Sequence, residues 1–100
     1  MLKHINLKKK VALITGAGKG IGKACAIALA QAGATVIIIS RTQSDLEKLS
    51  KIIKKIKGNS KFFVCDVTNT QKFNSIVISL PKLDILVNNA GTNIPEHFTK

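Results

Sequence analysis

Residues 15–22 of the chain read Thr15-Gly-Ala-Gly-Lys-Gly-Ile-Gly22, with glycine at every second position. The run in front of them, Val11 to Thr15, is short and apolar, a pattern typical of a strand buried on both faces. The segment behind them carries apolar residues at helical spacing as far as Gly33. A glycine-rich turn between a buried strand and a helix exposes backbone N–H groups and the positive end of the helix. This arrangement predicts a loop that binds phosphate groups.

The spacing of the glycines separates the known kinds of phosphate-binding loop. A nucleotide triphosphatase loop requires Gly-Lys followed by Ser or Thr, whereas Lys19 precedes Gly20. The G-x-G-x-x-G fingerprint would require glycine in place of Ile21. What remains is Gly-x-x-x-Gly-x-Gly, in which Gly16 lets the chain leave the strand, Gly20 approaches a pyrophosphate and Gly22 lets the helix pack closely. Taken alone, a glycine cluster is also compatible with a plain tight turn.

The remaining sequence alternates strand and helix patterns. The predicted strands are Val11–Thr15, Thr35–Ile39, Phe62–Val64 and Asp84–Val87. A βαβαβαβ order predicts an α/β fold, the N-terminal and incomplete portion of a Rossmann-type doubly wound parallel sheet. The expected strand order is 3-2-1-4, with helices on both faces.

Three helices are expected between these strands. The first should bury one stripe and end at Gly33; the stripe is Ile21, Ala24, Cys25, Ala28, Leu29 and Ala32. The second begins at a capping box of Ser44 and Glu47 and stops at Gly58; its apolar face is Leu46, Leu49, Ile53 and Ile56. The third spans about Gln71–Leu80 and presents Phe73, Ile76, Val77 and Leu80.

The composition and charge of the chain argue against several classes of function. The chain has 100 residues and a formal net charge of +11, but 15 of its 16 basic residues are lysines scattered along the sequence. Since Arg is preferred for phosphate and base-edge recognition, a solvated surface explains these lysines better than nucleic-acid binding. The longest apolar runs are too short to span a bilayer, so we expect a cytoplasmic protein with no membrane contact. Cys25 and Cys65 are expected to be reduced, buried thiols, and no metal site is expected.

The end of the second strand indicates which dinucleotide the loop would accept. An Asp or Glu there would bind the ribose 2′-hydroxyl of NAD, but the first acid in the chain is Asp45. Ser40 and Arg41 occupy the position instead, and Arg41 is the single arginine. A guanidinium can bind a 2′-phosphate through paired hydrogen bonds, and Lys19 can approach it from the loop. The sequence therefore predicts NADP(H), with two solvated cations as the alternative.

Three motifs together resemble the classical short-chain dehydrogenases/reductases, and the resemblance covers the chain from Lys10 to about Thr92. They are Thr15-Gly-x-x-x-Gly-Ile-Gly22, Asp66-Val67 after the third strand, and Asn88-Asn89-Ala90-Gly91 after the fourth. The family's catalytic Tyr-x-x-x-Lys has no counterpart, because the chain contains no Tyr. We therefore place no catalytic residue in it.

The resemblance also implies roles for individual positions. The pyrophosphate and adenosine ribose would be lined by Gly16, Ala17, Gly18, Lys19 and Ile21. Ser40 and Arg41 would bind the 2′-phosphate, and Asp66 would bind the adenine amino group with Val67 near the ring. The cofactor riboses would be followed by Asn89, Ala90 and Gly91, and Asn88 or Asn89 would brace the sheet. For Asp66 a helix-capping role, and for the Asn pair a plain turn, remain alternatives.

The function implied is hydride transfer between NADP(H) and a small-molecule carbonyl or secondary alcohol. Family members commonly run to about 250 residues, within the usual size range of one domain. We therefore expect residues 1–100 to be the N-terminal NADP-binding part of a single domain whose C-terminal half is absent. The open edge of the fourth strand agrees with this expectation. Full-length family members are often tetramers, so a homo-oligomer, tetramer or dimer, is expected. The alternatives are a non-catalytic NADP(H)-binding module or truncated fragment, and a basic nucleic-acid-binding protein.

Overall fold

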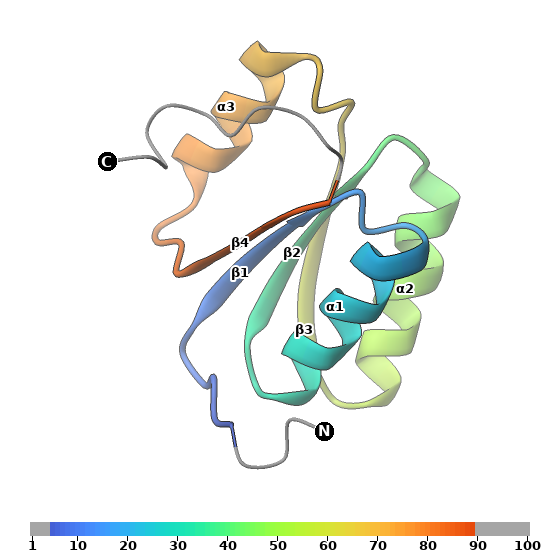
Figure 1. Cartoon of the computed structure of the whole chain (residues 1–100), viewed down its shortest axis with the longest axis vertical. Helices are drawn as coiled ribbons and strands as arrows, with labels where there is room; N and C mark the ends of the chain where they lie inside the picture. Colours follow the sequence, from blue (N-terminus) through green and yellow to red (C-terminus); the bar gives the residue numbers. More distant parts are fainter. Residues whose placement is uncertain (1–4, 90–100) are drawn as a thin grey trace.

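A computed structural model describes residues 5–89 of the chain. The central feature is a parallel sheet in the order β3-β2-β1-β4 (Figure 1). Its strands are β1 (Val11–Thr15), β2 (Thr35–Ser40), β3 (Asn59–Val64) and β4 (Ile85–Asn88). In register, Thr15 at the end of β1 lies beside Ile39 of β2 and Asn88 of β4. The predicted Rossmann-type fold and strand order are confirmed.

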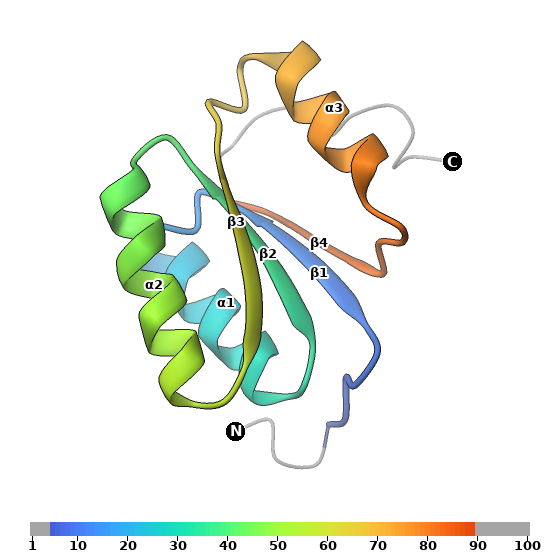
Figure 2. The ribbon, with the colours of Figure 1, turned by 180° about the vertical axis from the view of Figure 1, so that it is seen from behind.

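Helices cover both faces of this sheet. On one face α1 (Gly20–Gln31) and α2 (Gln43–Lys55) lie side by side, and on the other lies α3 (Thr70–Ser79), as the two opposite views show (Figure 2). Two apolar clusters follow from this layering. Ile14, Ile38 and Leu46 belong to the first cluster, whereas Leu13 and Phe73 belong to the second. Each fully buried aliphatic side chain of this size stabilises the fold by about 1.5–3 kcal/mol.

The buried face of α1 differs from the predicted stripe. Its buried residues are Gly22, Ala26 and Ala30, whereas Ile21 is 73% exposed and Ala24 is exposed. Spacing did not identify this face because α1 is apolar nearly all round, so several stripes satisfy the helical period. Small residues occupy the contact with the sheet, which lets the helix axis approach the strands closely.

The two long helices end in the same motif. After α1, Gly33 (φ +106°) donates to the Ala30 carbonyl at 3.0 Å and Ala34 donates to Leu29 at 3.1 Å. After α2, the N–H of Lys57 (φ +61°) donates to the Lys54 carbonyl, and the Gly58 N–H donates to the Ile53 carbonyl. Both are Schellman C-caps. The predicted end at Gly33 is confirmed, and in α2 the left-handed residue is the lysine before Gly58.

The predicted capping box of α2 is wrong. The helix begins at Gln43 with Thr42 as N-cap and no side-chain cap bond. Ser44 therefore lies inside the first turn, and Glu47 accepts a hydrogen bond from Gln43 at 3.3 Å. The Ser/Glu spacing satisfied the sequence pattern two residues too late, because a cap also requires extended backbone at the Ser, which Thr42 has.

Candidate functional site

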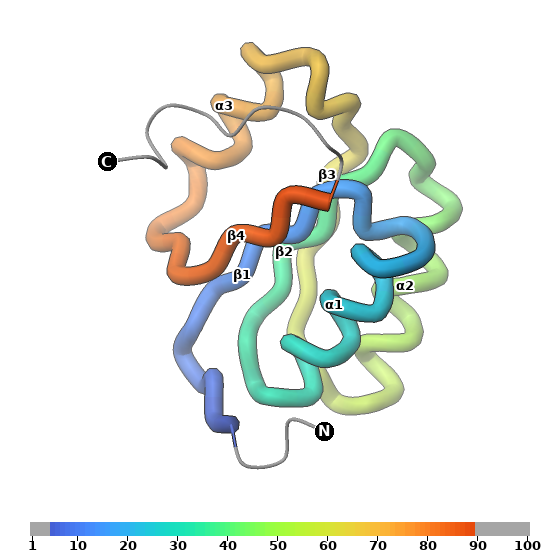
Figure 3. Tube along the Cα trace, viewed as in Figure 1, coloured from blue at the N-terminus to red at the C-terminus, as the bar shows by residue number. Residues whose placement is uncertain are grey.

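The glycine loop joins β1 to α1 at the carboxyl edge of the sheet, where the trace turns back over the strand ends (Figure 3). Gly16 (φ +61°) and Gly20 (φ +59°) have the left-handed backbone that glycine adopts most readily. Gly22 needs its missing side chain for another reason: a Cβ there would lie 2.2 Å from the Gly16 carbonyl oxygen. The loop geometry thus depends on glycine at the three positions that the spacing singled out.

Ala17 and the two asparagines hold this loop in place. Ala17 is fully buried, and its N–H donates to the Ile39 carbonyl at 3.1 Å. Asn89 donates from Nδ2 to the Gly16 carbonyl at 3.3 Å, and the Thr15 hydroxyl donates to Asn88 Oδ1 at 3.0 Å. Both asparagines therefore brace the end of β1. The structure places Ala17 beneath the loop, in the first apolar cluster, and not on its outer surface.

A cavity of about 350 Å³ opens beside the loop, at the carboxyl ends of β2 and β3. Five of the predicted site residues line it: Gly16, Ser40, Arg41, Asp66 and Val67. Three lining residues were missed, namely Ile39, Cys65 and Thr68. Ile39 and Cys65 each precede a predicted site residue at a strand end, and that adjacency is the signal that could have found them.

The other predicted residues lie outside this lining. Gly18, Lys19, Gly20, Ile21 and Gly22 continue along the loop into α1, and Asn89 lies beside Gly16. Lys19 is exposed at the N-cap position of α1, where the helix presents its positive end. Ala90 and Gly91 lie outside the residues that the structure describes.

Asp66 is held by a tight local turn. Its Oδ1 accepts hydrogen bonds from the Thr68 N–H at 3.0 Å and from the Thr68 hydroxyl at 2.7 Å. These bonds, the backbone one first, lower the pKa of the Asp66 carboxyl below its ordinary value, and the Arg41 guanidinium acts in the same direction. The carboxyl is therefore an ionised acceptor at neutral pH. The helix-capping role left open for Asp66 belongs to Asn69, which accepts from the Lys72 N–H at 3.2 Å.

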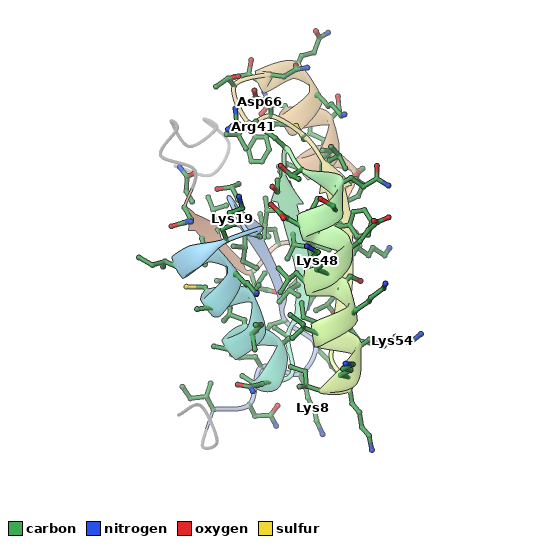
Figure 4. The ribbon with its side chains drawn as sticks, turned by 90° about the vertical axis from the view of Figure 1, so that its right-hand side faces the viewer. Lys8, Lys19, Arg41, Lys48, Lys54 and Asp66 are labelled. Atoms are coloured by element: carbon green, nitrogen blue, oxygen red, sulfur yellow. The ribbon has the colours of Figure 1, made fainter. Side chains whose placement is uncertain are left out.

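Ser40 and Arg41 also line the cavity, at the carboxyl end of β2. The Ser40 hydroxyl oxygen accepts a hydrogen bond from the Thr42 N–H at 3.3 Å, which fixes the chain where it leaves β2. Arg41 is exposed and is labelled beside Asp66 in Figure 4, at the same end of the molecule as Lys19 of the glycine loop. Residues that carry a guanidinium, a hydroxyl and a carboxylate, Arg41, Ser40 and Asp66, therefore line one small cavity.

Cys65 forms part of the cavity wall and is 3% exposed. Burial raises the pKa of its thiol, which keeps it protonated and unreactive at neutral pH. This agrees with the expected buried thiol, whereas Cys25 is only half-buried. Among residues 5–89, no group of three or more His, Cys, Asp or Glu side chains could hold a metal ion. Nor is any helix in that range long and apolar enough to cross a membrane.

The family model for short chain dehydrogenases matches residues 10–100. The chain belongs to the short-chain dehydrogenase family. It is 43% identical over 93 residues to a fatty acyl-CoA reductase of Acinetobacter baylyi, covering 89% of this chain and 32% of that protein. The chain thus spans about a third of the length of this relative. The resemblance that its three motifs indicate is confirmed.

Solved structures agree with this membership. A hydroxysteroid dehydrogenase from Escherichia coli superposes with a TM-score of 0.81 at 36% identity, over 95% of this chain and 42% of that one. A 7α-hydroxysteroid dehydrogenase in complex with NADH and 7-oxo glycochenodeoxycholic acid superposes with a TM-score of 0.77 at 37% identity, over 83% of this chain and 34% of that one. That dehydrogenase, which shares the fold of this chain, therefore binds a nicotinamide cofactor. Since that cofactor is NADH, the fold alone does not select between NAD(H) and NADP(H).

The residues of this short-chain dehydrogenase fit a dinucleotide. The glycine loop leaves no room for a side chain at Gly22. A Cβ on Gly18 would lie 2.9 Å from the Asp45 Cβ, so that position is crowded as well. Open α/β sheets bind ligands outside the carboxyl ends of their strands, at the point where the strand order reverses. Here that point lies between β1 and β4, next to Gly16.

Proposed function

We propose that this chain is the nucleotide-binding part of an NADP(H)-dependent oxidoreductase. In this proposal residues 1–100 are the N-terminal part of a single Rossmann-type domain. The observation that carries the proposal is Arg41, which follows Ser40 at the carboxyl end of β2 and lines the cavity with it. Family membership favours this interpretation over a non-catalytic module and over a nucleic-acid-binding protein.

The cofactor choice follows from charge at the end of β2. A carboxylate there would accept hydrogen bonds from an unsubstituted ribose and repel a 2′-phosphate. Arg41 reverses this preference, because a guanidinium donates paired hydrogen bonds to phosphate oxygens. In this proposal Ser40 adds a hydroxyl from the end of β2, and Lys19 adds a second cation from the glycine loop.

The other site residues receive roles in the same proposal. The N-terminus of α1 and the glycine loop, Gly16 to Gly22, would hold the pyrophosphate through backbone N–H groups. Asp66 would accept a hydrogen bond from the adenine amino group, with Val67 near the ring. The riboses would pass Asn89, and then Ala90 and Gly91 beyond the described residues.

The cofactor supplies a hydride at the nicotinamide C4, which is exchanged with a carbonyl or secondary alcohol. The residues of this chain bind and orient the adenosine end of that cofactor. The chain contains no Tyr, so we assign the proton transfer to none of its residues. A small-molecule substrate, a homo-oligomeric assembly and a cytoplasmic location are expectations for the complete protein.

Arg41→Asp tests the proposal on the complete protein. Removing a charge-assisted pair and adding a carboxylate should weaken NADP⁺ binding by about ten- to a hundred-fold and leave NAD⁺ binding nearly unchanged or improved. The dissociation constants are measured by isothermal titration. Lys48→Asp, the same charge reversal at an exposed position of α2, is the matched control and should alter neither preference. An unchanged ratio in Arg41→Asp contradicts the role of Arg41.

A further inference from the structure

Asp45 lies against the glycine loop although it belongs to α2. It occupies the first turn of that helix and is half-buried. A Cβ placed on Gly18 would lie 2.9 Å from the Asp45 Cβ and 3.2 Å from its Oδ2. The same point lies 3.1 Å from the Ser40 hydroxyl oxygen. The Asp45 carboxylate and the Ser40 hydroxyl therefore both lie against the glycine loop at Gly18.

No hydrogen bond within residues 5–89 is recorded for the Asp45 carboxylate. Its neighbour on the helix, Glu47, is bonded to Gln43, and Ser40 accepts from Thr42. A first-turn Asp also stabilises its helix through the macrodipole, by about 0.3–1 kcal/mol at most surface positions. That role requires no contact with the loop, so the approach to Gly18 is a separate property.

The charge around the site is more balanced than the charge of the whole chain. The chain carries 16 basic residues against five acids, yet Asp66 lines the cavity with Ser40 and Arg41, and Asp45 approaches Gly18 from the side on which Ser40 does. Arg41 acts electrostatically on Asp66, and both are labelled together at one end of Figure 4. Lys19 follows Gly18, the loop residue that Asp45 approaches. Two of the five acids of the chain thus lie close to residues that are proposed to bind the 2′-phosphate.

We propose that Asp45 is a second determinant of cofactor choice, which opposes Arg41 and Lys19. Its carboxylate accepts a hydrogen bond from a ribose hydroxyl and repels a 2′-phosphate. This inference rests on the proposed function, because it concerns the same dinucleotide site. The consequence is that the protein uses both NAD(H) and NADP(H), with a preference for NADP(H) smaller than Arg41 alone would give.

Asp45→Asn keeps the size of the side chain and removes its charge. Two unit charges a few ångström apart near a protein surface interact by about 1 kcal/mol or more, so NADP⁺ should bind about three- to ten-fold more tightly in this variant. NAD⁺ should not gain. The ratio of the two dissociation constants is the readout, since a role confined to the helix would leave the ratio unchanged. The shift should also shrink at high ionic strength, where charges are screened.

Glu47→Gln is the matched control, because it removes the same charge from α2 two positions away. It should leave the ratio unchanged, and thermal unfolding reports whether each variant is folded. Should Asp45→Asn fail to fold, Asp45→Ser tests the same charge with a residue suited to a helix start. An unchanged ratio in Asp45→Asn, with Arg41→Asp still effective, overturns this inference and leaves the proposed function standing. A wild-type protein that binds neither dinucleotide overturns both.

Discussion

Asp84 and Val11 are joined twice, although they are 73 positions apart in the sequence. The Val11 N–H donates to Asp84 Oδ2 at 2.8 Å, and the Asp84 N–H donates to the Val11 carbonyl at 2.9 Å. This pair fastens the start of β4 to the start of β1. Lys82 lies 3.4 Å from the same carboxylate oxygen. The register of β4 is therefore fixed by a carboxylate before the strand ladder begins.

The Asp84 pair predicts a loss of stability in acid. The hydrogen bond from Val11 lowers the pKa of the Asp84 carboxyl below its ordinary value, with Lys82 adding to the effect. A carboxyl whose pKa is lower in the folded protein than in the unfolded chain, where it is about 3.9, stabilises the fold at pH values above that unfolded value. This stabilisation is lost as the pH falls through the pKa of the folded state. Asp84→Ala should therefore lower the melting temperature at pH 7. Below about pH 5, the melting temperature of this variant should decrease less with falling pH than that of the wild type. Glu47→Ala is the control, and equal acid profiles for wild type and Asp84→Ala would contradict the assignment.

Substitutions at Gly22 and Gly20 test two different constraints on the glycine loop. Gly22 tests steric crowding of a side chain, and Gly20 tests the strain of left-handed backbone. Ala at position 22 would place its Cβ 2.2 Å from the Gly16 carbonyl oxygen, so Gly22→Ala should unfold the loop and abolish dinucleotide binding. At Gly20 nothing lies within 4 Å, and Gly20→Ala should cost only about 1–2 kcal/mol for its positive φ. Denaturant unfolding and dinucleotide affinity give the comparison. A Gly22→Ala protein as stable as Gly20→Ala would refute the crowding.

Much of the fold could be predicted from the sequence because its two central strands, β1 and β2, are buried on both faces. Such strands form continuous apolar runs, and Val11–Thr15 and Thr35–Ile39 were placed to within one residue of β1 and β2. The strand beginning at Asn59 was predicted three residues too short, since Asn59 and Lys61 are exposed and interrupt the apolar pattern. β3 lies at one end of the strand order, and a strand with exposed residues has no continuous apolar run by which to recognise it.

The candidate site was predictable where one motif contains all its parts. The glycine loop and the residues that end β2 and β3 follow from local sequence, so Gly16, Ser40 and Asp66 were found. The approach of Asp45 to Gly18 could not be predicted, because it depends on how α2 packs beside the loop. The fully buried position of Ala17 was missed for the same reason. Contacts between elements are set by tertiary packing, which a motif does not record.

Lys57 marks a position where a substitution should stabilise the protein. Its φ of +61° is left-handed backbone, which costs a residue with a Cβ about 1–2 kcal/mol. Gly33 occupies the equivalent position after α1. Lys57→Gly should raise the free energy of unfolding by about 1 kcal/mol, and Gly33→Ala should lower it by at least as much. Urea denaturation measures both, and a destabilised Lys57→Gly would show that the strain is absent.

Thr68 controls the ionisation and the orientation of Asp66. Its hydroxyl donates to Asp66 Oδ1 at 2.7 Å, in addition to the bond from its N–H. Thr68→Val removes the hydroxyl bond and keeps the shape, so the pKa of Asp66 should rise toward its ordinary value while the backbone bond holds part of the shift. The side chain should also rotate more freely, which would weaken binding of the adenine end of the cofactor. NMR titration of the Asp66 carboxyl checks the first effect, and 5′-AMP affinity checks the second.

Thr70→Val is the matched control, because it makes the same change two residues further on, at the exposed start of α3. It should move neither the pKa nor the affinity. If Thr68→Val raises the pKa of Asp66 but leaves 5′-AMP binding unchanged, the turn is real and the carboxylate does not contact adenine. If neither quantity changes, the hydroxyl bond does not hold Asp66 in solution.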